Sequence, residues 1–103
     1  MLITAVEPRR KSLSALFIDG EFAVNIDTET LLKSGFRAGR EISDEQLHEL
    51  IQNSDSRRAG EKALYLLEHR SHSQKELADK ISRVASREAA EAAAQHMADI
   101  GLV

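Results

Sequence analysis

The chain has 103 residues, of which 42% are apolar and 30% charged, and its formal net charge is −3. This composition fits one domain or two small modules, and it argues against wholesale disorder and against a protein that relies on phosphate contacts. Cysteine is absent, which excludes disulfides and thiolate chemistry and suits a reducing compartment. No signal peptide and no apolar run of the roughly 20 residues that a membrane helix needs are visible, so we expect a cytoplasmic protein.

The first quarter of the chain has the residue pattern of β-strands. Residues 2–8 (LITAVEP) alternate, and we expect Pro8 to end this strand because proline donates no hydrogen bond to a ladder. Residues 12–27 contain two β-rich runs around Asp19 and Gly20, a dipeptide typical of a two-residue hairpin turn. A hairpin alone is marginally stable, so the first strand or a helix should cover it.

A short helix should follow the hairpin. Residues 27–35 (DTETLLKSG) offer Asp27 or Thr28 as the N-cap and Gly35 as the stop. The next pattern, SDEQLHELI from residue 43, begins with a Ser and has a Gln three residues later, which is the spacing of a capping box. The sequence therefore predicts two helices in this part of the chain.

The polar run NSDS at residues 53–56 then interrupts the helical pattern, or only kinks a longer helix. A stronger helix is predicted over residues 57–70, with one apolar face made of Ala59, Ala63, Leu66 and Leu67. Gly60 is its weak point, because glycine costs a helix interior about 1 kcal/mol relative to alanine.

Residues 73–84 (SQKELADKISRV) predict a third helix in this module. Ser73 should cap it, with the Glu76 side chain reaching back to the cap. Leu77 and Ile81 are spaced to point inward. We expect Tyr65 and Leu66 of the preceding helix to face them.

Residues 86–103 predict a last helix that is rich in alanine and stops at Gly101. Its small side chains favour close approach of a neighbouring helix. The predicted fold is α+β: a small antiparallel β element with a short helix at residues 1–42, then a helical module at residues 43–103 whose last three helices form one unit.

The four histidines are the most obvious candidates for chemistry. His69 and His72 are three residues apart and could place two imidazoles on one metal ion, but no third ligand has a convincing position. His48 and His96 are isolated on predicted helices and should lie at the surface or at its boundary with the core. No Gly-rich phosphate loop, nucleophile motif or carboxylate pair is visible, so we predict no metal, no cofactor and no enzymatic activity.

Basic residues surround the corner between the helices predicted at residues 57–70 and 73–84. One interpretation is a solvated face, because Glu61, Glu76 and Asp79 lie nearby; the other is a surface for an acidic partner or for phosphates. The residues are Arg57, Arg58, Lys62, Arg70, Lys75, Lys80, Arg83 and Arg87.

The order of these motifs resembles the RecX family. Residues 63–81 (ALYLLEHRSHSQKELADKI), a polar break, a helix and a closing DIGLV are similar to the first three-helix repeat of RecX proteins. Residues 16–50, with their "DGE" hairpin, Leu-rich turn and acidic helix, resemble the part that precedes that repeat. RecX proteins resemble tandem arrays of such units, and the acidic continuation usual after Gly-Leu-Val is missing here.

RecX proteins are negative modulators of the RecA recombinase that lodge along the RecA–DNA filament, in recombination, DNA repair and the SOS response. The resemblance therefore implies a regulatory protein whose partner is the RecA filament, with a binding face made of Arg57, Arg58, Lys62, Arg70, Lys75, Lys80 and Arg83. The alternative is a helix-turn-helix module that binds DNA directly through residues 73–84. That helix offers only Gln74 and Lys75 in its first turn for contacts with bases.

Overall fold

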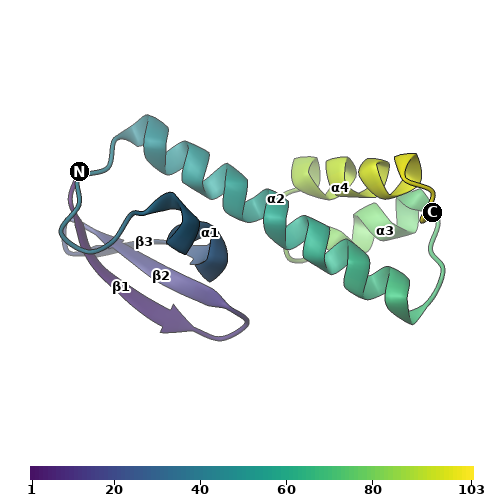
Figure 1. Ribbon diagram of the computed structural model, residues 1–103, viewed down its shortest axis with the longest axis horizontal. Helices are drawn as coiled ribbons and strands as arrows, with labels where there is room; N and C mark the ends of the chain where they lie inside the picture. The colour runs from purple at the N-terminus through teal and green to yellow at the C-terminus, as the bar shows by residue number, and fades with distance from the viewer. The chain divides into compact units, whose positions relative to one another are not determined.

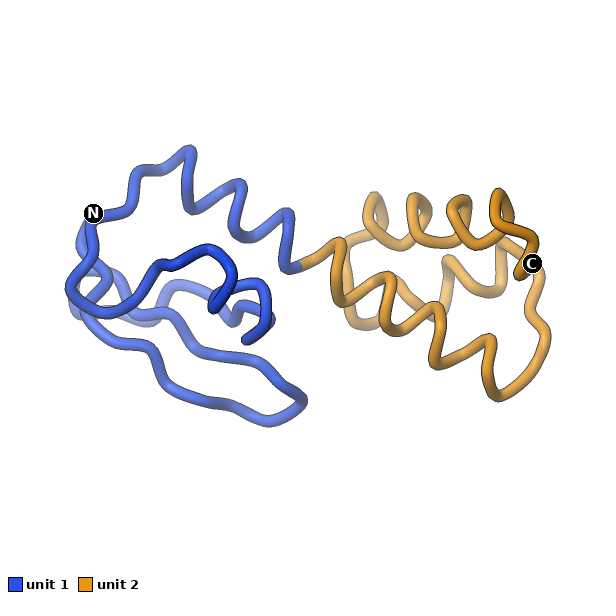
Figure 2. Tube along the Cα trace, in the orientation of Figure 1, with its two compact units in different colours: residues 1–54 blue, residues 55–103 orange.

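The computed structural model describes residues 1–103 (Figure 1). Its elements are β1 (Ile3–Arg9), β2 (Leu13–Ile18), β3 (Glu21–Asp27), α1 (Thr28–Ser34), α2 (Asp44–His69), α3 (Gln74–Ile81) and α4 (Arg87–Asp99). The predicted α+β class is confirmed. The chain forms two compact units, unit 1 at residues 1–54 and unit 2 at residues 55–103 (Figure 2). The chain passes from unit 1 to unit 2 within α2. The boundary expected from the sequence, between residues 42 and 43, falls just before that helix.

The three strands form one antiparallel sheet in the order β1-β2-β3. The predicted hairpin turn is confirmed: Asp19 and Gly20 both have positive φ, at 51° and 83°. Positive φ at both central residues is the geometry that matches the twist of the flanking strands. Gly20 also donates its backbone N–H to the Thr4 hydroxyl at 3.0 Å, which ties the turn to β1.

The expectation that Pro8 ends the first strand was wrong. β1 continues through Pro8 to Arg9, and Pro8 lies opposite Ser14 of β2. β1 is an edge strand, so a residue without an N–H is tolerated there when that position faces away from the ladder.

One face of the sheet is covered by α1 and by the N-terminal part of α2 (Figure 1). The buried side chains of this core are Ile3, Leu16, Ile18, Ile26, Leu31, Ile42 and Leu50. Asp27 is the N-cap of α1, accepting a hydrogen bond from Thr30 N at 2.9 Å, and Gly35 ends the helix in the left-handed conformation. Of the two caps left open by the sequence, the structure therefore selects Asp27.

The polar run at residues 53–56 does not interrupt α2, which is continuous from Asp44 to His69. Two of its side chains accept hydrogen bonds from distant backbone groups instead. The buried Ser54 hydroxyl accepts from Asp27 N at 2.8 Å, and both carboxylate oxygens of Asp55 accept from Ser86 N at 3.0 and 3.1 Å. At the middle of α2, Ser54 thus bonds to unit 1 and Asp55 to unit 2, and neither residue breaks the helix.

Unit 2 packs the second half of α2 against α3 and α4. Five of its eight buried core residues are alanines, and the set is Ala59, Ala63, Leu77, Ala78, Ile81, Ala90, Ala94 and Met97. Ser73 and Glu76 form the predicted capping box of α3, and Ser43 and Gln46 make the same reciprocal bonds at the start of α2. None of the helices is both long enough and apolar enough to span a membrane.

Candidate functional site

The seven cations singled out from the sequence all lie in unit 2. Arg57, Arg58 and Lys62 are on α2, Arg70 follows its end, Lys75 and Lys80 are on α3, and Arg83 lies just after α3. Unit 2 holds eight Lys and Arg against eight Asp and Glu, whereas unit 1 holds six against nine. The cations thus belong to a unit with no net charge, and the acidity of the chain resides in unit 1.

Two of the seven cations pair with glutamates at the surface. Arg57 lies 2.8 Å from Glu61 on the same helix, and Arg70 lies 3.1 Å from Glu76 at the start of α3. Exposed pairs of this kind are worth about 0–1 kcal/mol. A partner that offers its own carboxylate can therefore replace Glu76 as the partner of the exposed Arg70 at little cost.

The α3 carboxylates are held in their charged form by neighbouring donors. The Ser73 backbone N–H and then Arg70 lower the pKa of Glu76, and the hydrogen bond from Arg87 lowers the pKa of Asp79. Arg87 also bonds Glu91 at 2.8 Å and so links α3 to α4. Arg87 therefore makes its ion pairs within the unit; the sequence placed it among the basic residues of the corner but not in the predicted binding face.

Lys75 and Lys80 do not share a face. They are five positions apart on α3, which separates them by about 140° around the helix axis. Lys75 borders an open groove of about 430 Å³ between α3 and α4, together with Arg87 and Glu91. The Lys80 ammonium lies 3.0 Å from His72 Nε2. A partner that touches one lysine need not touch the other.

His72 is a buried connector in the loop before α3. It is only 7% exposed, its Nδ1 lies 2.9 Å from the Arg70 carbonyl and its Nε2 lies 3.0 Å from the Lys80 ammonium. A carbonyl can only accept and an ammonium can only donate, so Nδ1 carries the proton and Nε2 accepts. Both nitrogens of this ring are thus occupied, and the 103 residues contain no group of three or more metal-ligating side chains.

The remaining histidines lie at the surface. His48 and His96 are exposed, as predicted. His69 is exposed as well, and its Nδ1 lies 2.7 Å from the Tyr65 carbonyl one turn earlier in α2.

The expectation that Tyr65 faces α3 was wrong. Its side chain is 54% exposed, with the His69 ring 4.3 Å away and the Lys62 ammonium 5.0 Å from the ring centre. The core face of α2 contains Ala59, Ala63 and the half-buried Leu66, and Tyr65 is offset from Leu66 by about 100°. The helical spacing of Ala59, Ala63 and Leu66 on one face already predicts that Tyr65 lies outside that face.

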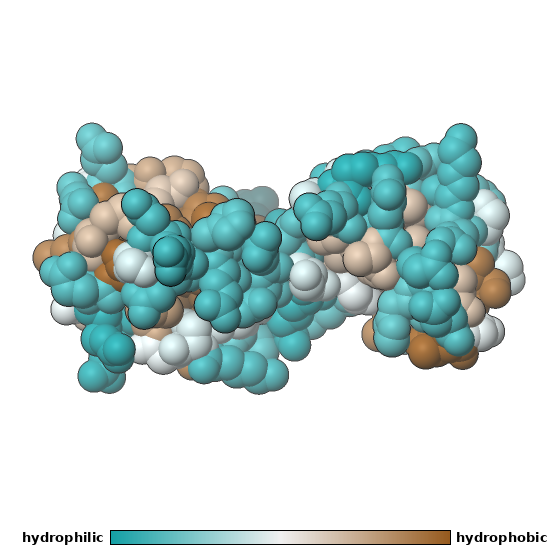
Figure 3. Space-filling model, turned by 90° about the horizontal axis from the view of Figure 1, so that it is seen from above, coloured by the Kyte–Doolittle hydropathy of each residue, from teal (hydrophilic) through white to brown (hydrophobic).

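Arg58, Lys62, Tyr65 and His69 recur at helical spacing along α2, and we call these four residues the Tyr65 stripe. Its two cations were among the residues predicted from the sequence, but the exposure of the aromatic ring that follows them was not predicted. On the face shown in Figure 3, polar residues cover most of unit 2 and the apolar area is confined to small patches. Among the exposed large side chains of unit 2, Tyr65 is the aromatic one, with Lys62 on one side of its ring and His69 on the other.

The similarity of this chain to known proteins is clear in sequence. No family model matches it. Three curated proteins named "Regulatory protein RecX" are similar to this chain. The protein from Caldanaerobacter subterraneus subsp. tengcongensis is 38% identical over 82 residues, and the protein from Clostridium beijerinckii is 33% identical over 76 residues. The protein from Bacillus velezensis is 24% identical over 83 residues. The matches cover 79%, 74% and 79% of this chain but only 42%, 36% and 32% of the relatives.

The fold is similar as well. A solved structure described as "Crystal structure of regulatory protein RecX" superposes with a TM-score of 0.64 at 17% identity, covering 99% of this chain and 51% of that one. The predicted resemblance to the RecX family is confirmed by these matches. The chain spans less than half the length of the curated relatives it matches.

Proposed function

Because this chain is a relative of the RecX regulatory proteins, we propose that it is a regulatory protein that binds the RecA filament on DNA and lowers RecA activity in recombination and repair. The observation that carries the proposal is the 38% identity to a RecX protein over 82 residues. Such a role requires a binding surface and no reacting groups, in keeping with the naming of the relatives as regulatory proteins.

The Tyr65 stripe is the part of unit 2 that we assign to partner contact. Tyrosine and arginine are the side chains that most often dominate interface energies, because they combine a large apolar area with polar ends. Tyr65 is exposed but already held between Lys62 and His69, so its ring loses little rotational freedom on binding. Arg58 would extend the contact toward the start of unit 2.

The other cations form a second group around α3. Lys75 and Arg83 are exposed, and Lys80 and Arg57 are half-buried, while Arg70 can exchange its glutamate partner for a carboxylate of the partner protein. We propose that these five cations steer an acidic filament surface toward unit 2 and affect the association rate more than the final affinity.

The test measures inhibition of the RecA ATPase on single-stranded DNA by the full chain and by variants of it. Tyr65→Ala should weaken inhibition at least tenfold, the loss expected for a central interface residue. Lys75→Glu should weaken inhibition mainly at low salt, because the variant loses a long-range electrostatic attraction that salt screens. Lys33→Glu is the matched control, since Lys33 is an exposed lysine of α1 in unit 1 and its reversal should leave inhibition unchanged.

Circular dichroism verifies that each variant remains folded. Absence of inhibition by the unaltered chain would contradict the proposal. Equal inhibition by the unaltered chain and Tyr65→Ala would move the contact elsewhere on the molecule.

The DNA-binding alternative has less support from the geometry of α3. Leu77, Ala78 and Ile81 are buried in the core of unit 2, so only the opposite side of this short helix could enter a groove. That side carries the ionised Glu76 and Asp79, which DNA phosphates repel. Strong binding to bare duplex DNA with a steep salt dependence would nevertheless favour this alternative over the RecA filament.

A further inference from the structure

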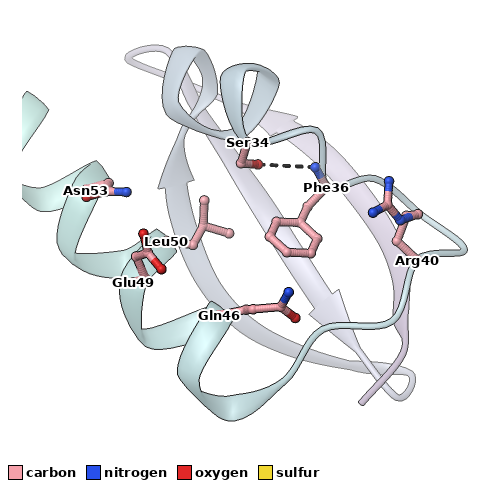
Figure 4. A pocket seen from close by; sticks show the side chains of 7 residues that line it. All are labelled: Ser34, Phe36, Arg40, Gln46, Glu49, Leu50 and Asn53. Atoms are coloured by element: carbon pink, nitrogen blue, oxygen red, sulfur yellow. Dashed lines mark hydrogen bonds between the residues drawn. The ribbon is translucent and has the colours of Figure 1, made fainter.

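Unit 1 contains a groove that the proposed regulation of RecA does not use. It has a volume of about 390 Å³ and lies between the segment that follows α1 and the N-terminal part of α2 (Figure 4). Its lining residues are Ser34, Phe36, Arg40, Gln46, Glu49, Leu50 and Asn53. The four from α2 fall at the i, i+3, i+4, i+7 spacing of one helix face, so this wall of the groove is a regular surface.

The floor of the groove is apolar and the rim is polar. Figure 4 shows the Phe36 ring beside Leu50, with Gln46, Glu49 and Asn53 along α2. Phe36 is half-buried and Leu50 is 3% exposed. The Ser34 hydroxyl accepts a hydrogen bond from Phe36 N at 3.2 Å, which fixes the backbone that carries the ring.

Arg40 at the rim is held in place but has no acidic partner. Its guanidinium lies 5.9 Å from the centre of the Phe36 ring, and one of its nitrogens lies 3.5 Å from the Gly35 carbonyl. It takes part in no ion pair, although unit 1 contains nine Asp and Glu against six Lys and Arg. A planar guanidinium with free N–H groups matches the two oxygens of a carboxylate.

The distance between Phe36 and Arg40 indicates the spacing of the groups that a ligand would present. One residue of extended chain advances about 3.3–3.6 Å, and successive side chains point to opposite faces. Side chains on one face are therefore two residues, about 7 Å, apart, which is close to the 5.9 Å between the Phe36 ring centre and the Arg40 guanidinium. The exposed Asn53 amide and Glu49 carboxylate, one helical turn apart on α2, supply a donor and acceptors for peptide backbone groups.

The charge of the surroundings selects against polyanions. Unit 1 has three more acidic than basic side chains, and Glu49 lines the groove itself. A phosphate chain would bring several negative charges into this field, whereas a single carboxylate can be matched by Arg40 alone.

We propose that this groove binds a short extended peptide in which an aspartate or glutamate lies two residues from an aliphatic or aromatic residue, so that both side chains are on the same face of the peptide. The apolar side chain packs on Phe36 and Leu50, and the carboxylate pairs with Arg40. The site is independent of the Tyr65 stripe, since it lies wholly within unit 1.

The first experiment titrates the isotope-labelled full chain with the peptide acetyl-Gly-Leu-Gly-Asp-Gly-amide and records amide shifts by NMR. We expect saturable shifts confined to residues 34–40 and 46–53. A peptide with Asn in place of Asp should bind about tenfold more weakly, the loss expected for one charge-assisted pair at a partly exposed site. A peptide with Ser in place of Leu should bind more weakly as well.

The second experiment compares two arginine variants with the same peptide. Arg40→Gln should weaken binding about tenfold. Arg37→Gln is the matched control, because Arg37 is exposed three residues away and does not line the groove, and it should bind as the unaltered chain does. The peptide series leaves the protein unchanged, so it decides the matter even if a variant folds poorly.

Four results would overturn the proposal. They are the absence of saturable shifts, equal affinity for the Asp and Asn peptides, the same shifts with inorganic phosphate alone, and shifts at the groove that depend on protein concentration without peptide. The last would identify the occupant as a second copy of this chain.

Discussion

The two units of this chain have hydrophobic cores made of different side chains. Unit 1 buries large aliphatic side chains between a sheet and two helical segments, with Ile3, Leu16 and Ile26 fully buried. Unit 2 brings helices together on alanines, and Leu77, Ile81 and Met97 are the only large residues in its buried core. Alanine contacts need close helix approach and tolerate no added volume, so unit 2 should depend more on each of its few large side chains.

The largest expected effect is therefore in unit 2. Leu77→Ala should lower the free energy of unfolding by about 2–5 kcal/mol, because Leu77 is fully buried and its truncation would leave a cavity. Hydrogen exchange measures it locally: amides of α3 and α4 should lose protection while those of β2 and β3 keep theirs. Equal loss of protection in both units would show that they unfold as one and would break the comparison.

An overpacking change sharpens the same contrast. Ala90→Leu should destabilise the chain by about 1–3 kcal/mol, since Ala90 is fully buried in the alanine core. Ala23→Leu is the matched control in unit 1, where Ala23 is exposed on β3, and should change stability by less than about 0.5 kcal/mol. Urea denaturation of both variants gives the two values. If Ala90→Leu lowered the free energy of unfolding as little as Ala23→Leu does, the helices of unit 2 would be packed less closely around Ala90 than the structure shows.

The smallest effect concerns the cap of α3. The pKa of Glu76 is lowered in the folded chain by the Ser73 backbone N–H and by Arg70. A carboxyl group whose pKa is lower in the folded chain than in the unfolded chain stabilises the fold at pH values above its unfolded pKa. This contribution is lost as the pH falls through its folded pKa. Glu76→Gln should therefore melt below the unaltered chain at pH 7, and the difference should shrink below about pH 4. A difference that persists at pH 2 would assign the effect to the lost capping geometry and not to the charge.

Local chemistry predicted the ends of the elements, and long-range contacts decided what the sequence left open. The Asp19-Gly20 turn and the Ser73–Glu76 cap depend on residues at most three positions apart, so both were visible in the sequence. The continuity of α2 was not, because Ser54 and Asp55 bond to backbone groups 27 and 31 positions away. Without those partners, a polar run in a helical pattern resembles a break.

The candidate surfaces were predicted unevenly for the same reason. Composition revealed the cations of unit 2, but the exposure of Tyr65 depends on which face of α2 packs against α3. The groove in unit 1 was not predicted at all, because Phe36 and Arg40 lie in a segment without regular structure and meet α2 only in the folded chain.

We propose above that this RecX relative recognises a protein filament and not DNA alone. The most direct test of this proposal is the binding of the fluorescently labelled full chain, by anisotropy, to RecA filaments assembled on single-stranded DNA and to the same DNA without RecA. The account predicts saturable binding to the filament, at least tenfold tighter than to the bare DNA and weakened by Tyr65→Ala. Equal binding to bare DNA, or no binding to the filament, would contradict it.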